Sequence, residues 1–104
     1  MANPLKPAER VKIPRQHMPE QDATARSRNF EEVNLGLTFE LAKSEAARCL
    51  ECASPKCVVA CPVGVKVKEF VDLMLAGDFP AAARILRQDN SLPAITGRVC
   101  PQED

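Results

Sequence analysis

Apolar residues recur at helical spacing in three stretches of the chain, residues 38–50, 66–76 and 80–88. Thr38 is a good N-cap for the first stretch, which runs to about Leu50. Gly77 and Asp78 separate the other two, and they suit a left-handed C-cap followed by an N-cap. The apolar positions are Leu41, Ala42, Ala46, Cys49 and Leu50, then Val67, Phe70, Val71, Met74 and Leu75, and finally Ala83, Ile85 and Leu86. The pattern predicts three helices in close succession.

The rest of the chain is less regular. Residues 1–21 contain four prolines and no helical or strand period, which predicts an extended arm. A short helix is expected over 22–33 and a helical turn over 57–61, and Asn90, Pro93 and Gly97 break the helical pattern near the end. No convincing strand is present in the sequence. We therefore predict an all-α domain over residues 22–104 that follows an extended Pro-rich arm.

Composition limits what this domain does. The chain has 104 residues, four Phe, no Tyr and no Trp, so its core is thin, and a bound metal or metal cluster would help it fold. The 14 basic and 14 acidic residues balance, and no apolar run approaches the ~20 residues of a spanning helix. We therefore expect neither a nucleic-acid nor a membrane partner. The first residues lack an apolar signal-peptide core, which predicts a cytoplasmic location where thiols stay reduced.

Five cysteines provide the candidate chemistry, Cys49, Cys52, Cys57, Cys61 and Cys100. The first four form a C-x2-C-x4-C-x3-C-P run, close to the bacterial ferredoxin run that holds an iron–sulfur cluster. Thiolates are soft ligands of the kind that such clusters require. An odd number of cysteines crowded into one segment also argues against a disulfide framework.

Two other uses of the cysteines fit less well. A structural zinc site more often has two separated C-x2-C pairs, whereas this chain has one. A redox dithiol at Cys49 and Cys52 would accompany a βαβ unit, which the pattern does not predict. His17 stands alone in the arm and is not expected to be a ligand. We favour iron–sulfur binding, and keep a zinc-binding helical interaction module as the alternative from another class.

The number of ligands is informative. In ferredoxin-type runs the cysteine before proline serves a different cluster from the first three. Cys49, Cys52 and Cys57 would then share one cluster, while the two Cys-Pro cysteines, Cys61 and Cys100, would share a second. Both clusters lack ligands, so we expect the sequence to be cut inside its cofactor-binding domain.

From about Phe30 to Glu103 the chain resembles the N-terminal iron–sulfur domain of the glutamate synthase small subunit and of dihydropyrimidine dehydrogenase. The resemblance rests on residues 45–52 (EAARCLEC), the Pro55-x-Cys57 turn, Cys61-Pro62-Val63, Phe70, Gly77-Asp78, Asn90-x-Leu92-Pro93 and residues 97–101 (GRVCP). It implies an α-helical ferredoxin fold with two [4Fe–4S] clusters in the full-length parent, and the same division of the five cysteines. It also implies two further cysteines and FAD- and NADPH-binding domains beyond Asp104, so the chain on its own need not retain a cluster.

The function that this resemblance implies is electron relay within an NADPH-dependent oxidoreductase of glutamate biosynthesis. Flavin on the parent's own FAD/NADPH domains would pass electrons through the clusters to a larger catalytic partner subunit. The same domain in an NADH-dependent ferredoxin:NADP oxidoreductase or a sulfur reductase is the alternative within the class. Backbone amides near Ala53, Lys56 and Val63-Gly64 are candidates to bond the sulfurs, and Arg48 and Arg98 flank the ligands. The cysteines are ligands and not nucleophiles, so the chain alone is not expected to be catalytic.

Overall fold

The computed structural model describes residues 3–101 and confirms the all-α class over that range. Seven helices follow one another there: α1 (Pro7–Arg10), α2 (Ala23–Arg26), α3 (Phe39–Ala47), α4 (Lys56–Ala60), α5 (Val67–Ala76), α6 (Phe79–Asp89) and α7 (Pro93–Val99). The only β-type pairing within this range is an isolated antiparallel bridge between Glu20 and Asn34. In the same range, no helix is long and apolar enough to cross a membrane.

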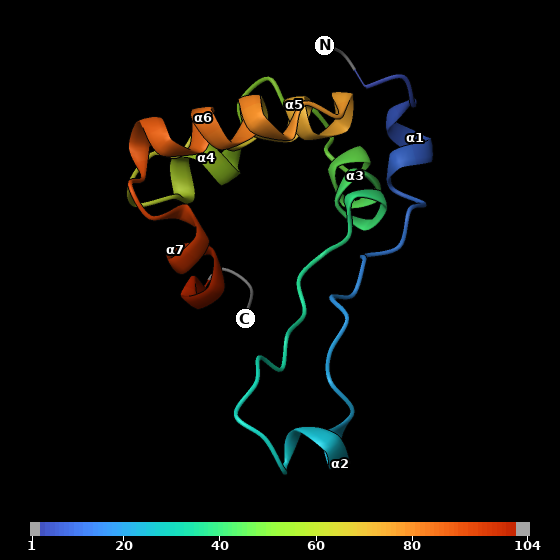
Figure 1. Ribbon diagram of the computed structural model, residues 1–104. Coiled ribbons are helices and arrows are strands. Elements are labelled where there is room, and N and C mark those ends of the chain that lie inside the picture. The colour runs from blue at the N-terminus through green and yellow to red at the C-terminus, as the bar shows by residue number, and fades with distance from the viewer. Residues whose placement is uncertain (1–2, 102–104) are drawn as a thin grey trace.

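Helices α3, α5 and α6 form the frame of the molecule. The main helix pairings are α5 with α6 and α3 with α5, and Figure 1 shows α5 and α6 lying along one another above α3. Small side chains fill the interior, and the buried hydrophobic residues among those described are Ala42, Ala46, Ala47, Val65 and Ala82. Phe39 and Phe79 add an edge-to-face contact with ring centroids 4.9 Å apart. The core is as thin as the composition predicts.

Caps support three of the predicted boundaries in this frame, namely the starts of α3 and α6 and the end of α5. The Thr38 hydroxyl accepts a hydrogen bond from the Leu41 amide at 3.2 Å, and the Asp78 carboxylate accepts one from the Ala81 amide at 3.0 Å. Gly77 has φ +90°, the left-handed conformation that ends α5. Local sequence signals therefore determine where these helices begin and where α5 ends.

The prediction for the first 33 residues is partly wrong. A turn of helix, α1, interrupts the extended arm, and the predicted helix over 22–33 stops at Arg26. Asn29 provides the reason, because its side-chain carbonyl accepts from the Glu31 amide and its side-chain NH2 donates to Ala25 O. Such local side-chain bonds compete with helix continuation.

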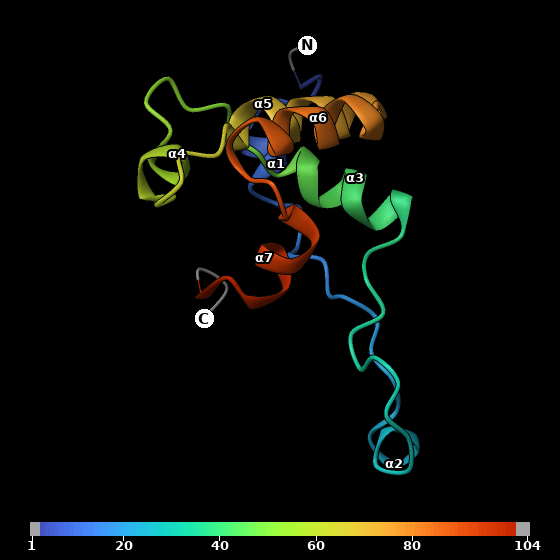
Figure 2. The same ribbon diagram turned by 60° about the vertical axis from the view of Figure 1, so that its left-hand side comes forward.

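After α2 the chain turns back, so that residues 33–35 lie alongside residues 19–21. Bonds from Gln21 N to Val33 O (2.9 Å) and from Leu35 N to Pro19 O (2.8 Å) join the two limbs. In Figures 1 and 2 these limbs run side by side away from the helical frame, with α2 at the far end. We call residues 12–37 the hairpin arm.

The last helix is a second correction. Residues after Asn90 were expected to be irregular, yet Pro93–Val99 forms α7. Proline lacks only an N–H that is unpaired in the first turn of any helix, so Pro93 begins α7 rather than breaking it. The Asn90 side chain accepts from Leu92 N and donates to Thr96 Oγ1, which fixes the start of the helix.

Two residues that were predicted to face the interior are exposed. Leu50 is 47% exposed because α3 ends at Ala47, three residues earlier than expected, so Leu50 lies in the following loop. Ala83 is exposed and Ala82 is buried in its place, since α6 packs on α5 through a slightly different face. Cys49 and Cys52 therefore lie in a loop after α3 and not on the helix itself.

Candidate metal centre

The five cysteines lie on three separate parts of the helical domain. Cys49 and Cys52 belong to the loop that follows α3, and Cys57 lies in α4. Cys61 and Cys100 are the C-cap residues of α4 and α7. All five are free thiols, and Cys49 and Cys61 are half-buried whereas the other three are exposed. The thiols are thus available for a ligand rather than used as core packing.

The structure does not gather these thiols around one point. Within residues 3–101, no three side chains of the Cys, His, Asp or Glu type come close enough together to hold a metal ion. The predicted ligand sets, Cys49 with Cys52 and Cys57, and Cys61 with Cys100, therefore stay predictions. What the structure shows of each set is the surroundings of its members.

Cys61 lies in a cradle of backbone amides. The pKa of its thiol lies below the ordinary value because the N–H groups of Val65 and then Val63 donate to the sulfur, with a smaller contribution from Gly64. Burial and the Asp89 carboxylate oppose this effect. Val63 and Gly64, whose amides were candidates to bond the sulfurs, are among these contributors, and Val65 is a third. For Ala53 and Lys56 the same expectation stays a prediction. Amide N–H groups aimed at a thiolate are the surroundings that cluster ligands use.

A different kind of support surrounds the Cys49–Cys52 loop. Glu51, between the two cysteines, has φ +53°, a conformation that non-glycine residues rarely adopt. The pKa of its carboxyl lies below the ordinary value, first because the Asn3 backbone N–H donates to it and also because Arg10 donates to it and carries a positive charge. Burial opposes that shift and Lys68 adds to it. Charged side chains distant in sequence thus converge on this loop.

Sequence analysis missed Arg10, which is 6% exposed. A single arginine in a proline-rich arm gives no periodic signal, and only its contacts in the folded chain identify it. The two arginines that flank the predicted ligands in the sequence each make an ion pair. Arg48 pairs with Glu45 within the α3 region, and Arg98 pairs with Glu32 of the hairpin arm at 3.2 Å.

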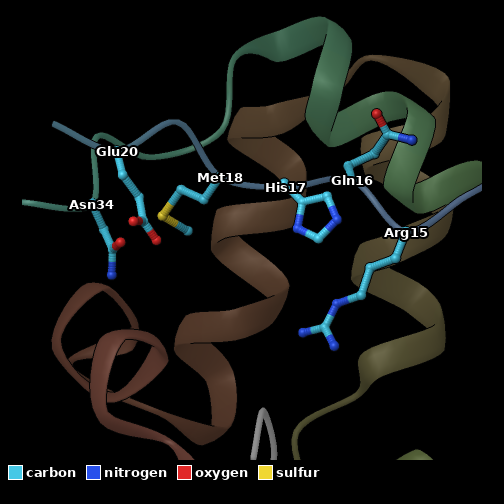
Figure 3. A pocket seen from close by; sticks show the side chains of 6 residues that line it. All are labelled: Arg15, Gln16, His17, Met18, Glu20 and Asn34. Atoms are coloured by element: carbon cyan, nitrogen blue, oxygen red, sulfur yellow. The ribbon is translucent and has the colours of Figure 1, made fainter. Parts of the chain in front are cut away.

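Two concavities lie near these elements. An apolar groove between α3 and α5, lined by Ala46, Phe70 and Met74 among others, reaches Cys49. A polar pocket on the hairpin arm, shown in Figure 3, is lined by Arg15, Gln16, His17, Met18, Glu20 and Asn34. No cysteine lines that pocket, and His17 faces it rather than any of the candidate ligands. The arm pocket is therefore separate from the candidate metal centre.

The donor set itself fits an iron–sulfur cluster. Five free thiols, one of them in a cradle of amides, match the thiolate ligation of [4Fe–4S] centres. Hard cations such as Mg²⁺ or Ca²⁺ prefer oxygen ligands, whereas the donors of this set are sulfurs.

Comparison with known proteins agrees with this chemistry. Residues 26–104 match the family described as dihydropyrimidine dehydrogenase domain II, 4Fe-4S cluster. The chain is 40% identical over 80 residues to the putative oxidoreductase AegA of Escherichia coli, covering 76% of this chain and 12% of that protein. It is 34% identical over 93 residues to the glutamate synthase [NADPH] small chain of Halomonas elongata, covering 89% and 20%.

A third relative is the NAD-dependent dihydropyrimidine dehydrogenase subunit PreT of Salmonella typhimurium, 38% identical over 74 residues, which covers 71% of this chain and 18% of that protein. The chain thus spans about a fifth or less of the length of these relatives. The comparison establishes a family for the helical domain, and the relatives' other domains lie outside it.

Proposed function

The chain belongs to the family of 4Fe–4S domains described as dihydropyrimidine dehydrogenase domain II, and from this premise we propose that it relays electrons within an NADPH-dependent oxidoreductase resembling glutamate synthase. The observation that carries the proposal is the five free thiols, carried by helix ends and loops inside the segment that matches the family.

The proposed ligands divide into two sets. Cys49, Cys52 and Cys57 would hold three corners of one cluster, and Cys61 and Cys100 two corners of a second. The donation of Val63, Gly64 and Val65 amides to Cys61 supports its role, because such bonds stabilise a thiolate. The position of Cys100 at the C-cap of α7 supports a role for that helix in presenting the last ligand of this segment.

A [4Fe–4S] cluster would supply one-electron transfer when bound. The residues of this chain contribute the thiolates, the amide donors that stabilise their charge, and the α3–α5 frame that carries them. Electrons would come from FAD and NADPH on further domains of the parent protein and go to a larger catalytic partner subunit. The final acceptor in a glutamate synthase would be 2-iminoglutarate. Because iron–sulfur ligation needs reduced thiols, the proposed location is the cytoplasm.

A role in glutamate biosynthesis is the most specific part of this proposal. One relative has NADPH in its name and another has NAD, and they match this chain at similar identity, 34% and 38%. An NADH-dependent ferredoxin:NADP oxidoreductase or a sulfur reductase would use the same ligands in the same way. The domain's own role, carrying electrons on thiolate-bound iron, is common to all of them.

Anaerobic reconstitution with iron and sulfide tests the proposal. We expect about four irons and a matching amount of acid-labile sulfide per chain, because one cluster has three of its ligands within nine consecutive residues. The matched control is the chain with all five cysteines blocked by alkylation before reconstitution. Stoichiometric zinc with no iron or sulfide would contradict the proposal and favour a helical interaction module.

A further inference from the structure

The N-terminal segment lies against the end of α3, immediately before the first cysteines. Figure 1 shows α1 beside α3, and the contacts between them are specific. The Asn3 side-chain NH2 donates to Ala47 O at 2.9 Å, and Arg10 Nη1 donates to Cys49 O at 3.1 Å. The last carbonyls of a helix have no partner within the helix, so the Asn3 side chain completes the end of α3, while Arg10 binds the first residue after the C-cap Arg48.

Arg10 uses its whole guanidinium in this contact. Its Nε donates to Leu5 O at 2.7 Å and its Nη2 to Asn3 O at 3.2 Å, which fixes the N-terminal segment around it. Its Nη1 also lies 3.0 Å from Glu51 Oε2. One buried arginine thus connects the N-terminal segment to the Cys49 carbonyl and to the Glu51 carboxylate.

The bond network continues on both sides of Glu51. The other carboxylate oxygen of Glu51 accepts from Asn3 N at 2.9 Å, so the carboxylate is held at both oxygens. From α5, Lys68 Nζ lies 3.5 Å from Glu51 O and 3.4 Å from Cys52 O. Residues 3 and 10 thus hold the carboxylate of Glu51 and Lys68 holds its carbonyl, at a residue whose backbone is left-handed.

We propose that Arg10 is a positioning residue for the candidate metal centre, which holds the Cys49–Cys52 loop in one conformation so that both thiols are presented together. The proposal rests on the proposed function, since it assigns a purpose to the loop's geometry. Two thiols three residues apart reach one cluster only in a limited set of backbone conformations, and fixing the loop beforehand lowers the entropy lost on binding. The positive charge of Arg10, which is bonded to the Cys49 carbonyl, also favours a more negative, reduced cluster.

The experiment compares Arg10→Gln and Arg10→Lys with the matched control Arg28→Gln. Arg28 is another arginine of the N-terminal third, exposed on the hairpin arm. Amide exchange is measured first in the metal-free chain. We expect exchange of the amides of residues 50–53 to quicken by about tenfold or more in Arg10→Gln, with α5 and α6 unchanged. Arg10→Lys should fall between, because an ammonium keeps the charge but cannot bond several acceptors in a fixed fork.

The second measurement is the reduction potential of the reconstituted variants. We expect Arg10→Gln to shift the potential downward and Arg10→Lys to restore part of the shift, while Arg28→Gln leaves it unchanged. Unchanged exchange at residues 50–53 together with an unchanged potential would overturn the proposal. Equal quickening of exchange throughout α5 and α6 would also overturn it, because Arg10 would then support the fold in general.

The two proposals fail in different ways. If the wild-type chain takes up stoichiometric zinc and no iron or sulfide, the proposed function fails, while exchange at residues 50–53 still decides whether Arg10 fixes the loop. If the wild type binds a cluster and Arg10→Gln leaves both exchange and potential as they were, the positioning role fails and the proposed function stands.

Discussion

The two sides of the candidate metal centre are built in different ways. The Cys49–Cys52 loop is held by groups from distant parts of the chain, namely the Asn3 backbone amide and the Arg10 and Lys68 side chains. Cys61 is held by backbone amides two to four residues further along. The first side depends on the tertiary fold and the second on a local turn. A local turn forms with little entropic cost, whereas long-range contacts form only when the whole frame is assembled.

The largest expected effect comes from removing ligands on each side. Cys52→Ala should reduce iron and sulfide nearly to background, because it removes one of the three ligands proposed for the first cluster. Cys100→Ala should retain most of the iron that the wild-type chain binds, since the second cluster has only two ligands in this chain. Iron and sulfide assays after anaerobic reconstitution measure both variants.

Ser54→Ala, an exposed residue beside Cys52, is the control and should bind as the wild type does. Equal loss of iron in Cys52→Ala and Cys100→Ala would contradict the division of ligands into two sets.

Metal removal should expose a difference in amide exchange between the cysteine-containing segment and helices α3, α5 and α6. In the metal-free chain we expect residues 54–64 to exchange their amides about a hundredfold faster than α3, α5 and α6, because the bonds of this segment are local and mostly exposed. Adding iron and sulfide should then protect the segment. Amide exchange followed by mass spectrometry measures this difference. Protection of residues 54–64 equal to that of the helices, without metal, would show that folding and iron binding are not coupled.

Asn3→Ala tests the long-range side by a change in stability. Asn3 is buried, and its loss leaves the Ala47 carbonyl unpaired, so we expect a decrease of ~1–3 kcal/mol in the free energy of unfolding. Denaturant titration of the metal-free chain measures it. Asn34→Ala, on the exposed hairpin arm, is the matched control and should change stability by less than about 0.5 kcal/mol. Equal effects would mean that the N-terminal segment does not support the frame.

Gly64→Ala tests the local side. Gly64 has φ +69°, and a Cβ there would meet nothing within 4 Å, so the cost is backbone strain alone, about 1–2 kcal/mol. Gly97→Ala is the opposite case, because Gly97 lies inside α7 without a positive φ and alanine favours helix by roughly 0.5–1 kcal/mol. Thermal or denaturant unfolding of the two variants should therefore move in opposite directions. A neutral Gly64→Ala would show that the turn after Cys61 is not fixed.

The smallest effect is expected where the hairpin arm meets α7. Arg98 and Glu32 form an ion pair at 3.2 Å, but their side chains are 58% and 67% exposed, so Arg98→Gln should cost about 0–1 kcal/mol. The effect should disappear at high salt, because exposed charges are screened. Unfolding at low and high ionic strength measures it. A larger loss would indicate that the arm and the Cys100 region form one cooperative unit.

Sequence patterns predicted the parts of the fold that depend on local chemistry. Thr38, Gly77 and Asp78 are caps whose hydrogen bonds or backbone conformation involve only near neighbours, and the structure has them as expected. Val63 and Gly64 were among the amides expected near the sulfurs, and they lie only two and three residues after Cys61, whose pKa they lower.

The parts that were missed depend on competition or on long-range contacts. The helix expected over 22–33 ends early because Asn29 bonds the backbone on both sides, and α7 forms because Pro93 starts it. Arg10 was unpredictable from the sequence, because its partners Cys49 and Glu51 are about 40 residues away. The grouping of the cysteines into clusters stays a prediction, because within residues 3–101 no three of the ligand-type side chains meet.

The central claim is that these thiols carry a redox-active iron–sulfur cluster, and a redox titration of the anaerobically reconstituted chain tests it most directly. The account predicts a reversible one-electron transition, with an electron paramagnetic resonance signal that appears on reduction and disappears on reoxidation. The same titration on the alkylated chain should give neither. Bound metal without any such transition would contradict the account, because the domain could then not relay electrons.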